Sequence, residues 1–323
     1  MDVSVTGANG FLGVHLVRTL RARGDRVRCL VRRADEAKAL SEVGAEVLEG
    51  DVTKADTLPR AIDGADCVVH LAGVRRAPVK GTFMHVNAEG TRRVCEAMVK
   101  GGARRLLFAG SLAASGPSTP GNPLREDAPF HPREWYGESK AEGERIAFSF
   151  RDRLEVTSIR PVRIMGPGDR ENLPFFRIVQ RGLKLEVTGP RRPISFVDVA
   201  DVVAHCLLLM ERKEAVGEAF FSVGEELSLV EMQDIAAQVL GVTTRRVPIP
   251  PAVLKALAAA ADGVSTVSGK KLPLNRKLAR QLLAPAWSCS PEKSARLLGF
   301  RAKVSMRESI AQSAQWYREQ GWL

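Results

Sequence analysis

Tyr136 and Lys140 stand four residues apart in the segment WYGESK, residues 135–140. In a helix this spacing puts both side chains on the same face. A phenol ordinarily titrates near pH ~10, and a neighbouring ammonium stabilises the phenolate and brings the pKa toward neutral pH. Such a pair can serve as a general acid or base. The same spacing is common in ordinary exposed helices, so the pair alone does not identify a reaction.

Ser111 supplies a third polar group, at the end of the apolar run LLFAGS, residues 106–111. The run predicts a strand, and a hydroxyl at its carboxyl end can hydrogen-bond a substrate oxygen on which charge develops. The alternative is that Ser111 only forms a turn. We predict Ser111, Tyr136 and Lys140 as the catalytic residues.

A glycine-rich segment, TGANGFLG at residues 6–13, follows the first predicted strand and opens the first helix. Glycine permits a close approach of the backbone to a pyrophosphate, and the N–H groups at the helix start favour its charge. The alternative is an ordinary tight turn. The residues predicted to bind the cofactor here are Gly7, Asn9, Gly10, Phe11, Leu12 and Gly13.

The second predicted strand ends in Arg32 and Arg33, where dinucleotide-binding folds place the residue that contacts the adenine ribose. A guanidinium can pair with a 2′-phosphate, whereas a carboxylate would repel it. NADP is therefore favoured over NAD, with Arg32 as the first candidate ligand and Arg33 as the second. The alternative is that both arginines face solvent and that Asp35 or Glu36 binds the ribose of NAD.

Two further segments follow predicted strands, at the edge where ligands of open α/β sheets bind. We expect their residues Asp51, Val52, Leu71, Ala72 and Gly73 to line the cofactor site. Asp51 can accept a hydrogen bond from the adenine amino group. It can equally cap a turn, and the sequence does not separate the two.

These groups need a scaffold, and the chain alternates short β-rich runs with helical patterns. Strands are expected near residues 2–6, 26–31, 45–48, 66–71, 104–109, 154–160 and 219–223. The alternation predicts an α/β fold, a Rossmann-type doubly wound parallel sheet with a smaller, mostly helical substrate-binding lobe. We expect an NAD(P)-binding domain at 1–165, completed by 194–224, and a substrate-binding lobe at 166–193 and 225–323. The strand that begins at 194 is expected to return to the main sheet.

Composition narrows the class of protein. The formal net charge is +11 over 323 residues, but the basic residues are scattered pairs without a nucleic-acid-binding motif, so no nucleic acid partner is expected. Five widely spaced cysteines fit free buried thiols, and no metal is expected. No apolar run is long enough for a transmembrane segment, and a strand pattern starts at once where a signal sequence would stand. We therefore expect a soluble, cytoplasmic protein.

The ordered motifs together resemble the extended branch of the short-chain dehydrogenase/reductase superfamily, over nearly the whole chain. They are a GxxGxxG turn, HLAG at 70–73, Asn87 in VNAEGT, Ser111, a YxxxK pair and RPVRIMGPGD at 160–169. The resemblance implies that Tyr136 donates or accepts the proton, that Lys140 binds the nicotinamide ribose and that Ser111 orients the carbonyl. It implies that the backbone near Pro161 and Ile164 contacts the carboxamide, and it suggests a homodimer. Asn87 is either structural or part of the cofactor pocket.

Within that superfamily the pattern is closest to members resembling 3β-hydroxysteroid dehydrogenase and dihydroflavonol reductase. Sugar-nucleotide enzymes commonly carry Asn where Arg163 stands here. The apolar Leu173, Phe175 and Phe176, with Arg163, are the tentative substrate pocket, although ordinary core packing explains such residues equally. An apolar helix at 253–261 suits a pocket or lid.

The expected function is NAD(P)H-dependent interconversion of a ketone and a secondary alcohol on a lipophilic small molecule that is steroid-, flavonoid- or keto-acid-like. The alternative is a nucleotide-sugar epimerase or dehydratase, which Arg191 and Arg192 favour because cations in the second lobe suit a diphosphate. A third hypothesis is a non-catalytic NAD(P)-binding protein. Such a protein tolerates the loss of a catalytic residue, yet all three are present.

Overall fold

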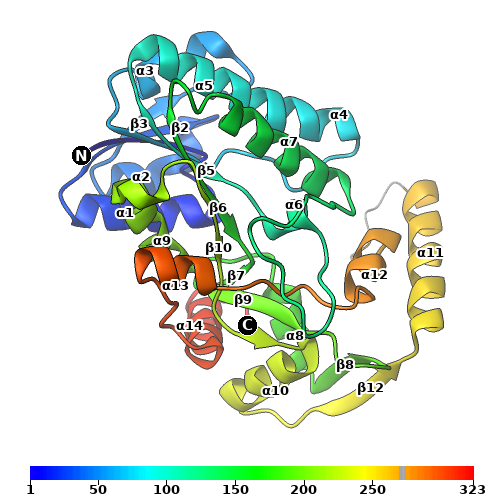
Figure 1. The fold of residues 1–323 in the computed structure, drawn as a ribbon. Helices are drawn as coiled ribbons and strands as arrows, with labels where there is room; N and C mark the ends of the chain where they lie inside the picture. Colours follow the sequence, from blue (N-terminus) through cyan, green and yellow to red (C-terminus); the bar gives the residue numbers. More distant parts are fainter. Residues whose placement is uncertain (269–271, 273) are drawn as a thin grey trace.

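Seven parallel strands form the central sheet of the protein, in the order β10-β6-β5-β4-β1-β2-β3 (Figure 1). The computed structural model describes residues 1–268, 272 and 274–323. The Rossmann-type fold class expected from the sequence is confirmed. The strands are β1 (Asp2–Thr6), β2 (Arg26–Val31), β3 (Glu46–Glu49), β4 (Cys67–His70), β5 (Arg105–Ala109), β6 (Glu155–Pro161) and β10 (Ala219–Ser222).

Each face of this sheet is covered by helices, because its strands are apolar on both sides. In β4, Cys67 and Val69 join the core shared with α1 and α9, while Val68 joins the core on the opposite face with α3, α5 and α7. This alternation is the two-residue period of a strand. The covering helices are α1 (Phe11–Ala22), α9 (Val199–Glu211), α3 (Pro59–Ile62), α5 (Gly90–Gly101) and α7 (Trp135–Ser149).

The chain changes direction across the sheet between β1 and β4. From β1 it proceeds outward to β2 and β3, and it then returns to the other side of β1 to add β4, β5 and β6. The crevice at the carboxyl ends of such neighbouring strands is where open α/β sheets bind ligands. The Gly-rich turn after β1 and the HLAG segment after β4 both lie at this point.

The second lobe is built from two small sheets and several helices (Figure 1). Phe176, Phe196, Met232 and Tyr317 are among the residues of its core. Its strands are β7 (Arg163–Met165), β8 (Leu183–Val187), β9 (Ile194–Asp198), β11 (Glu226–Leu227) and β12 (Arg245–Ile249). Its helices are α8 (Leu173–Gln180), α10 (Leu229–Leu240), α11 (Pro251–Ser268), α12 (Arg276–Leu282) and α14 (Met306–Glu319).

The strand at 194 differs from the expectation. Instead of returning to the main sheet, β9 pairs with β7 and β11 in a three-stranded sheet. The place beside β6, at the edge of the main sheet, is taken by β10. The helix that follows β9, α9, does pack on the main sheet beside α1.

Shorter helical elements complete the described chain. They are α2 (Lys38–Ser41), α4 (Lys80–Phe83), a π-helical segment (Met84–Glu89), α6 (Leu112–Ser115), α13 (Glu292–Leu298) and 3₁₀ turns at Ala34–Ala37, Ala55–Thr57 and Lys213–Ala215. All five cysteines are buried and free. Across the described ranges, none of the helices has both the length and the apolarity that crossing a bilayer requires.

Candidate active site

The Gly-rich turn brings the chain against the end of β4. Gly7 has a φ of +68°, and a Cβ placed on it would lie 2.7 Å from backbone atoms of Ala72. A Cβ on Gly13 would lie 2.5 Å from the carbonyl oxygen of Ala8. Only glycine fits at these two positions. The first N–H groups of α1 have no acceptor within the helix, so this turn suits the pyrophosphate of a dinucleotide.

The other residues expected at this turn lie near the surface. Asn9 and Gly10 are exposed, while Phe11 and Leu12 are half-buried. The ring of Phe11 packs edge-on against His15, whose Nε2 lies 2.8 Å from the carbonyl oxygen of Pro167. This contact connects the start of α1 to the segment that enters the second lobe.

A buried hydrogen-bond chain connects the end of β1 to α5. Thr91 Oγ1 donates to the carbonyl of Asn87 at 2.7 Å, so its oxygen accepts from His70 Nε2 at 3.1 Å. His70 Nδ1 is left to accept from Thr6 Oγ1 at 2.7 Å. Burial, with a contribution from the Lys140 ammonium, lowers the pKa of His70 to about 3. The imidazole is therefore neutral and holds fixed positions for the segments around the crevice.

Asn87 links the loop after β4 to α7. Its amide exchanges two hydrogen bonds with the backbone of Val74, at 2.7 and 2.9 Å, and donates a third to Ser139 Oγ at 2.9 Å. Ser139 Oγ in turn donates to the carbonyl of Tyr136 at 2.8 Å. The side chain of Asn87 is thus used in a structural link. It also lies under Gly73, where a Cβ would be 3.0 Å from Asn87 Oδ1.

Two glycines let α7 approach its neighbours. A Cβ on Gly137 would lie 2.2 Å from the carbonyl oxygen of Ala113 in α6, and one on Gly143 would lie 2.6 Å from the carbonyl oxygen of Asn87. Backbone atoms cannot move aside as a flexible side chain can. Gly137 thereby seats Tyr136 next to α6, the short helix that Ser111 caps.

Lys140 is the buried cation of the site. Its side chain points toward the sheet, with Nζ 4.4 Å from the centre of the Phe108 ring, and the residue is 5% exposed. Burial lowers the pKa of Lys140 to about 8, although the Glu144 carboxylate opposes this shift. No residue in the described part of the chain accepts a hydrogen bond from its ammonium. A desolvated cation without an acceptor is suited to receive ligand hydroxyls.

Ser111 is the N-cap residue of α6, and Tyr136 lies one turn before Lys140 in α7. Ser111 Oγ accepts from the N–H of Ala113 at 3.1 Å and so caps α6, and its hydroxyl hydrogen remains available to a ligand. Tyr136 is half-buried, and its hydroxyl has no hydrogen-bond partner among the described residues. This cap is a local structural role of the kind that the alternative gave to Ser111, and it holds Oγ in place.

Behind Lys140, a buried ion pair fixes α7 to β6. Arg160 donates to Glu144 through Nη2 at 2.5 Å and Nε at 3.0 Å, and Ser158 Oγ donates to the same carboxylate at 2.9 Å. Both charged side chains are almost fully buried. Removing one partner would leave an uncompensated buried charge, so this pair holds the helix in place.

At the adenine end, the two arginines differ. Arg33 forms exposed ion pairs with Asp35 at 2.8 Å and Glu36 at 3.1 Å. Arg32 is exposed and has no ion-pair or hydrogen-bond partner in the described part of the chain. Asp51 Oδ1 accepts from the N–H of Thr53 at 2.8 Å, which is the turn-capping arrangement.

The remaining cofactor candidates lie on strand ends. Val52 is buried under Gly90, and Leu71 and Ala72 are half-buried directly after β4. Pro161 ends β6, and the carbonyl of Ile164 in β7 accepts from Asn172 at 3.3 Å.

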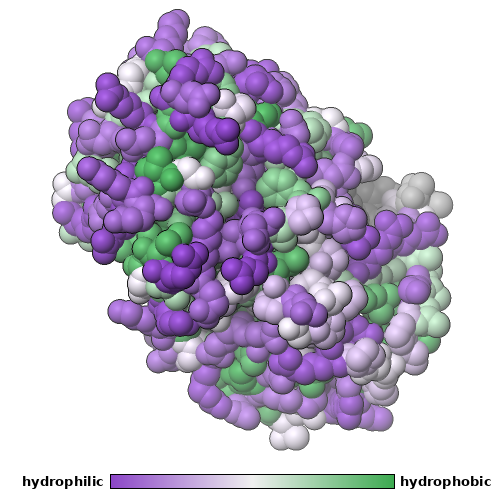
Figure 2. All heavy atoms as spheres, viewed as in Figure 1, coloured by the Kyte–Doolittle hydropathy of each residue, from purple (hydrophilic) through white to green (hydrophobic). Residues whose placement is uncertain are grey.

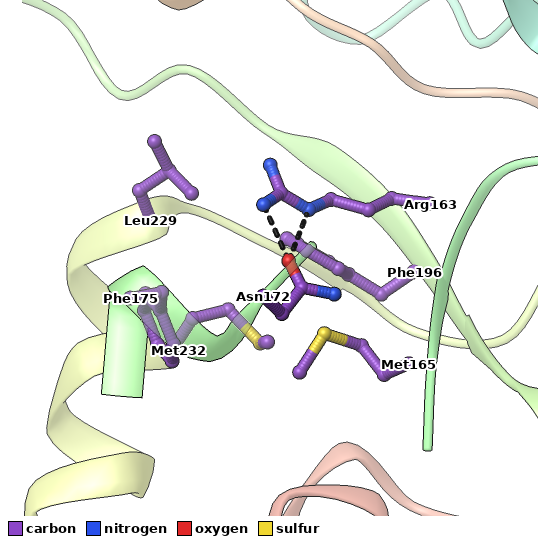
Figure 3. Close-up of a pocket in the computed structure, with 7 residues that line it drawn as sticks. All are labelled: Arg163, Met165, Asn172, Phe175, Phe196, Leu229 and Met232. Atoms are coloured by element: carbon purple, nitrogen blue, oxygen red, sulfur yellow. Dashed lines mark hydrogen bonds between the residues drawn. The ribbon is translucent and has the colours of Figure 1, made fainter. Parts of the chain in front are cut away.

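Arg163 and Phe175 line a small recess in the second lobe (Figure 3). Arg163 donates through Nε and Nη2 to Asn172 Oδ1, at 3.1 and 2.5 Å. The recess of about 10 Å³ has room for at most one water. Arg163 is exposed to solvent, yet desolvation by the protein around it lowers the pKa of its guanidinium. The lining residues are Arg163, Met165, Asn172, Phe175, Phe196, Leu229 and Met232.

The other lobe residues singled out from the sequence lie elsewhere. Phe176 is fully buried in the lobe core, with its ring 5.0 Å from that of Tyr317, and Leu173 packs on the same core. Arg191 pairs with Glu226 and Glu231. Arg192 donates to backbone carbonyls of its own loop. Core packing therefore describes Leu173 and Phe176.

Comparison with known proteins identifies the family of the chain. The model of the NAD dependent epimerase/dehydratase family matches residues 3–224. A ceramide reductase of Caulobacter vibrioides is 30% identical over 334 residues, covering 99% of this chain and 96% of that protein. A sterol demethylase protein B of Methylococcus capsulatus is 30% identical over 334 residues, covering all of both chains. The crystal structure of gox2253 matches with a TM-score of 0.83 and 26% identity, over 100% of this chain and 99% of that one.

Proposed function

Because this chain belongs to the NAD-dependent epimerase/dehydratase family, we propose that it interconverts a ketone and a secondary alcohol on a lipophilic small molecule. It is an NAD(P)-dependent oxidoreductase of the short-chain dehydrogenase/reductase type. The observation that carries the proposal is Lys140, a buried cation without an acceptor among the described residues, one helical turn from Tyr136. This arrangement suits proton transfer to a carbonyl oxygen.

In the direction of reduction, each residue has a separate task. The cofactor, when bound, supplies the hydride to the carbonyl carbon. Tyr136 gives its hydroxyl proton to the carbonyl oxygen, and Ser111 donates a hydrogen bond that orients this oxygen. The Lys140 ammonium stabilises the phenolate that remains, until Tyr136 regains a proton from solvent. The fixed seat of α7 on α6 keeps these groups in position.

Exposed apolar side chains on several elements support a lipophilic substrate. Val79 and Trp135, which flank the loop after β4 and the start of α7, are 55% and 46% exposed. Val253 and Leu257 on α11 are 46% and 51% exposed, and Figure 2 shows apolar side chains along this edge of a mostly hydrophilic face. The names of the two relatives, ceramide reductase and sterol demethylase protein B, both refer to lipids.

For the cofactor we propose a preference for NADP(H), with Arg32 as the ligand of the 2′-phosphate. Arg32 is the arginine whose guanidinium remains available, since Arg33 is paired with Asp35 and Glu36. Arg32→Ala should weaken NADPH binding about tenfold and leave NADH binding unchanged, as measured by fluorescence titration. An unchanged preference for NADPH would refute the assignment.

A nucleotide-sugar epimerase or dehydratase is the second candidate. The family includes such enzymes by name, and cationic side chains surround the mouth of the cleft. The support expected from Arg191 is weaker, because Glu226 and Glu231 neutralise this side chain.

A panel assay tests the two candidates against each other. The protein is incubated with NADPH, or with NADH, and with steroid ketones, long-chain ketones, β-keto acids and UDP- or GDP-sugars. Consumption of reduced cofactor with a lipophilic ketone supports the proposal. Conversion of a nucleotide sugar without net consumption supports the second candidate and contradicts the first.

A further inference from the structure

Four cations from the two parts of the fold lie near one another. Arg75 and Arg76 lie in the loop after β4, Arg163 lies in β7 and Lys277 lies in α12. We call these four residues the cationic rim. None of these four residues has a part in the proposed transfer of hydride or proton.

On the main-sheet side, hydrogen bonds of Asn87 connect the loop that carries Arg75 and Arg76 to helix α7. Val74, directly before Arg75, is held by the Asn87 amide, which also binds Ser139 of α7. The side chains of Arg75 and Arg76 are 65% and 80% exposed and reach across the cleft to Glu171, at 3.7 and 3.1 Å. The two guanidinium groups thus share one carboxylate.

On the lobe side, Arg163 is held by a neutral group. Its Nε and Nη2 both donate to Asn172 Oδ1, next to Glu171 in the chain, and its Nη1 points away from Asn172 (Figure 3). Within the described ranges, Nη1 has no hydrogen-bond acceptor. The guanidinium is therefore oriented and keeps a donor for a ligand.

Lys277 closes the rim beside the catalytic tyrosine. Its ammonium pairs with Glu134, which stands at the N-cap position of α7, two positions before Tyr136, without a side-chain capping hydrogen bond. The same ammonium lies 5.7 Å from the centre of the Phe83 ring. Burial and repulsion from Arg75 and Arg76 lower the pKa of Lys277, which agrees with the closeness of the three cations.

The charges of the rim do not balance. Its four cations pair with two carboxylates in the described part of the chain, Glu171 and Glu134, and a third carboxylate, the buried Asp169, acts on Arg163. Four positive and three negative charges leave a surplus of one positive charge among these residues. A phosphate monoester carries a charge of about −1.5 to −2 at pH 7, and guanidinium groups bind its oxygens in a fork.

We propose that the cationic rim binds a phosphate group on the substrate, so that the ketone reduced at Tyr136 belongs to a lipophilic molecule with a phosphorylated head. This inference rests on the proposed function and adds the substrate class. The same chemistry is also present in a nucleoside diphosphate, and the test separates the two sources.

The test uses a matched pair of substrates: a long-chain hydroxyketone and its phosphate monoester, both with saturating NADPH so that the cofactor site is filled. The wild type should show a kcat/KM at least tenfold higher for the phosphate. In the double variant Arg75→Ala/Arg76→Ala this ratio should fall to about 1. Arg191→Ala, which removes an exposed arginine of the second lobe, is the control and should keep the wild-type ratio.

The possible results test phosphate binding by the cationic rim and the proposed ketone reduction separately. Equal kcat/KM for both ketones in the wild type would overturn the rim while leaving the ketone reductase intact. Loss of the ratio in Arg191→Ala would also overturn it. If neither ketone is reduced, the proposed function fails, and UDP binding to the NADPH-saturated protein then tests the rim. Weaker UDP binding by the double variant would support the rim with a nucleotide as the source, and unchanged binding would overturn it.

Discussion

On the main-sheet side of the cleft, polar side chains bind one another, from Thr6 through His70 to Thr91 and from Asn87 to Ser139. On the lobe side, Arg163 and Glu171 are exposed. Arg163 keeps a donor without an acceptor in the described part of the chain, and Glu171 faces two arginines. The first side holds its groups in one arrangement, whereas the second offers groups to a ligand.

The fixed groups on the main-sheet side serve the reaction, and the exposed groups on the lobe side serve substrate specificity. Preorganised groups lower the barrier only if they keep their positions during the reaction, so they belong on packed helices and strand ends. Exposed side chains on loops and short helices can change without disturbing that core.

Replacing the catalytic phenol should have the largest effect. Tyr136→Phe removes the proton donor and leaves the ring, so kcat should fall about a thousandfold, within the range for general acid catalysis. NADPH affinity, measured by fluorescence titration, should stay within about twofold of wild type. A variant with a normal rate would show that the fixed side of the cleft does not perform the proton transfer.

Gly137→Ala tests whether the seat of α7 positions the tyrosine. The new Cβ would lie 2.2 Å from the Ala113 carbonyl oxygen and would push α7 from α6. A displacement on the order of 1 Å costs up to about a hundredfold in rate, so we expect kcat to fall between about tenfold and a hundredfold. The matched control is Gly263→Ala on α11, where a Cβ has no atom within 4 Å. If the control loses as much activity as Gly137→Ala, the positioning role is wrong.

The charge of Lys140 should set a pH dependence. Because burial lowers the pKa of Lys140 to about 8, the free enzyme loses this cation as the pH rises through that value. The kcat/KM for the cofactor reports the free enzyme and should fall about tenfold between about pH 7 and pH 9. Lys140→Arg keeps its charge in this range and should remove that decline, even if its rate is lower. A flat wild-type profile would contradict the role of the charge.

His205 lies in the packed part of the main-sheet side, and replacing it should change stability but not activity. It is fully buried in α9, stacks on Phe300 at 4.1 Å between ring centres, and neither ring nitrogen has a hydrogen-bond partner among the described residues. An unsatisfied buried polar group costs about 1–3 kcal/mol, so His205→Leu should raise the free energy of unfolding by about that amount in urea denaturation. Activity should not change. The exposed His85→Leu is the control and should shift stability by less than about 0.5 kcal/mol.

The same variant has a signature in acid. Burial lowers the pKa of His205 to about 3, below its ordinary value of 6.5. Between these values the unfolded chain binds a proton that the folded chain does not, so stability falls as the pH decreases, by about 1.4 kcal/mol per pH unit. His205→Leu should show a shallower loss than wild type below about pH 6. An identical slope in both proteins would refute the neutral buried histidine.

Much of the main sheet follows from local sequence patterns, because buried parallel strands are apolar runs and its helices bury one face. The pairing of strand β9 could not be predicted from such patterns. Its residues suit any buried strand, and pairing with β7 instead of β6 depends on β10 occupying the edge of the main sheet. Competition for an edge involves segments far apart in the chain, so it is not visible in any one of them.

The site divides in the same way. Ser111, Tyr136, Lys140 and the Gly-rich turn carry recognisable spacings, and the structure brings these segments to one edge of the sheet. Gly137 and Ser139 stand within the same motif, but their roles depend on Ala113 and Asn87, which approach only in the folded chain. Phe175 and Phe176 are neighbours in an apolar run. Only the packing of α8 distinguishes the one that lines the recess from the one in the core.

The cationic rim was not predictable for a related reason. Arg75 and Lys277 are about two hundred residues apart and look like ordinary surface charges in the sequence. The Arg191 and Arg192 pair offered an equally good pattern, yet it is engaged by neighbouring groups. Distinguishing a neutralised charge from an available one requires the contacts.

Net hydride transfer to a lipophilic ketone can be measured by following deuterium from the cofactor to the product. The protein is incubated with NADPH carrying deuterium at the transferred position and with the ketone that the panel selects, and the product is analysed by mass spectrometry. We predict an alcohol with one deuterium on the carbinol carbon, formed in equal amount to the oxidised cofactor, and no such product with Tyr136→Phe. Deuterium that stays in the cofactor while a nucleotide sugar is converted would contradict the account.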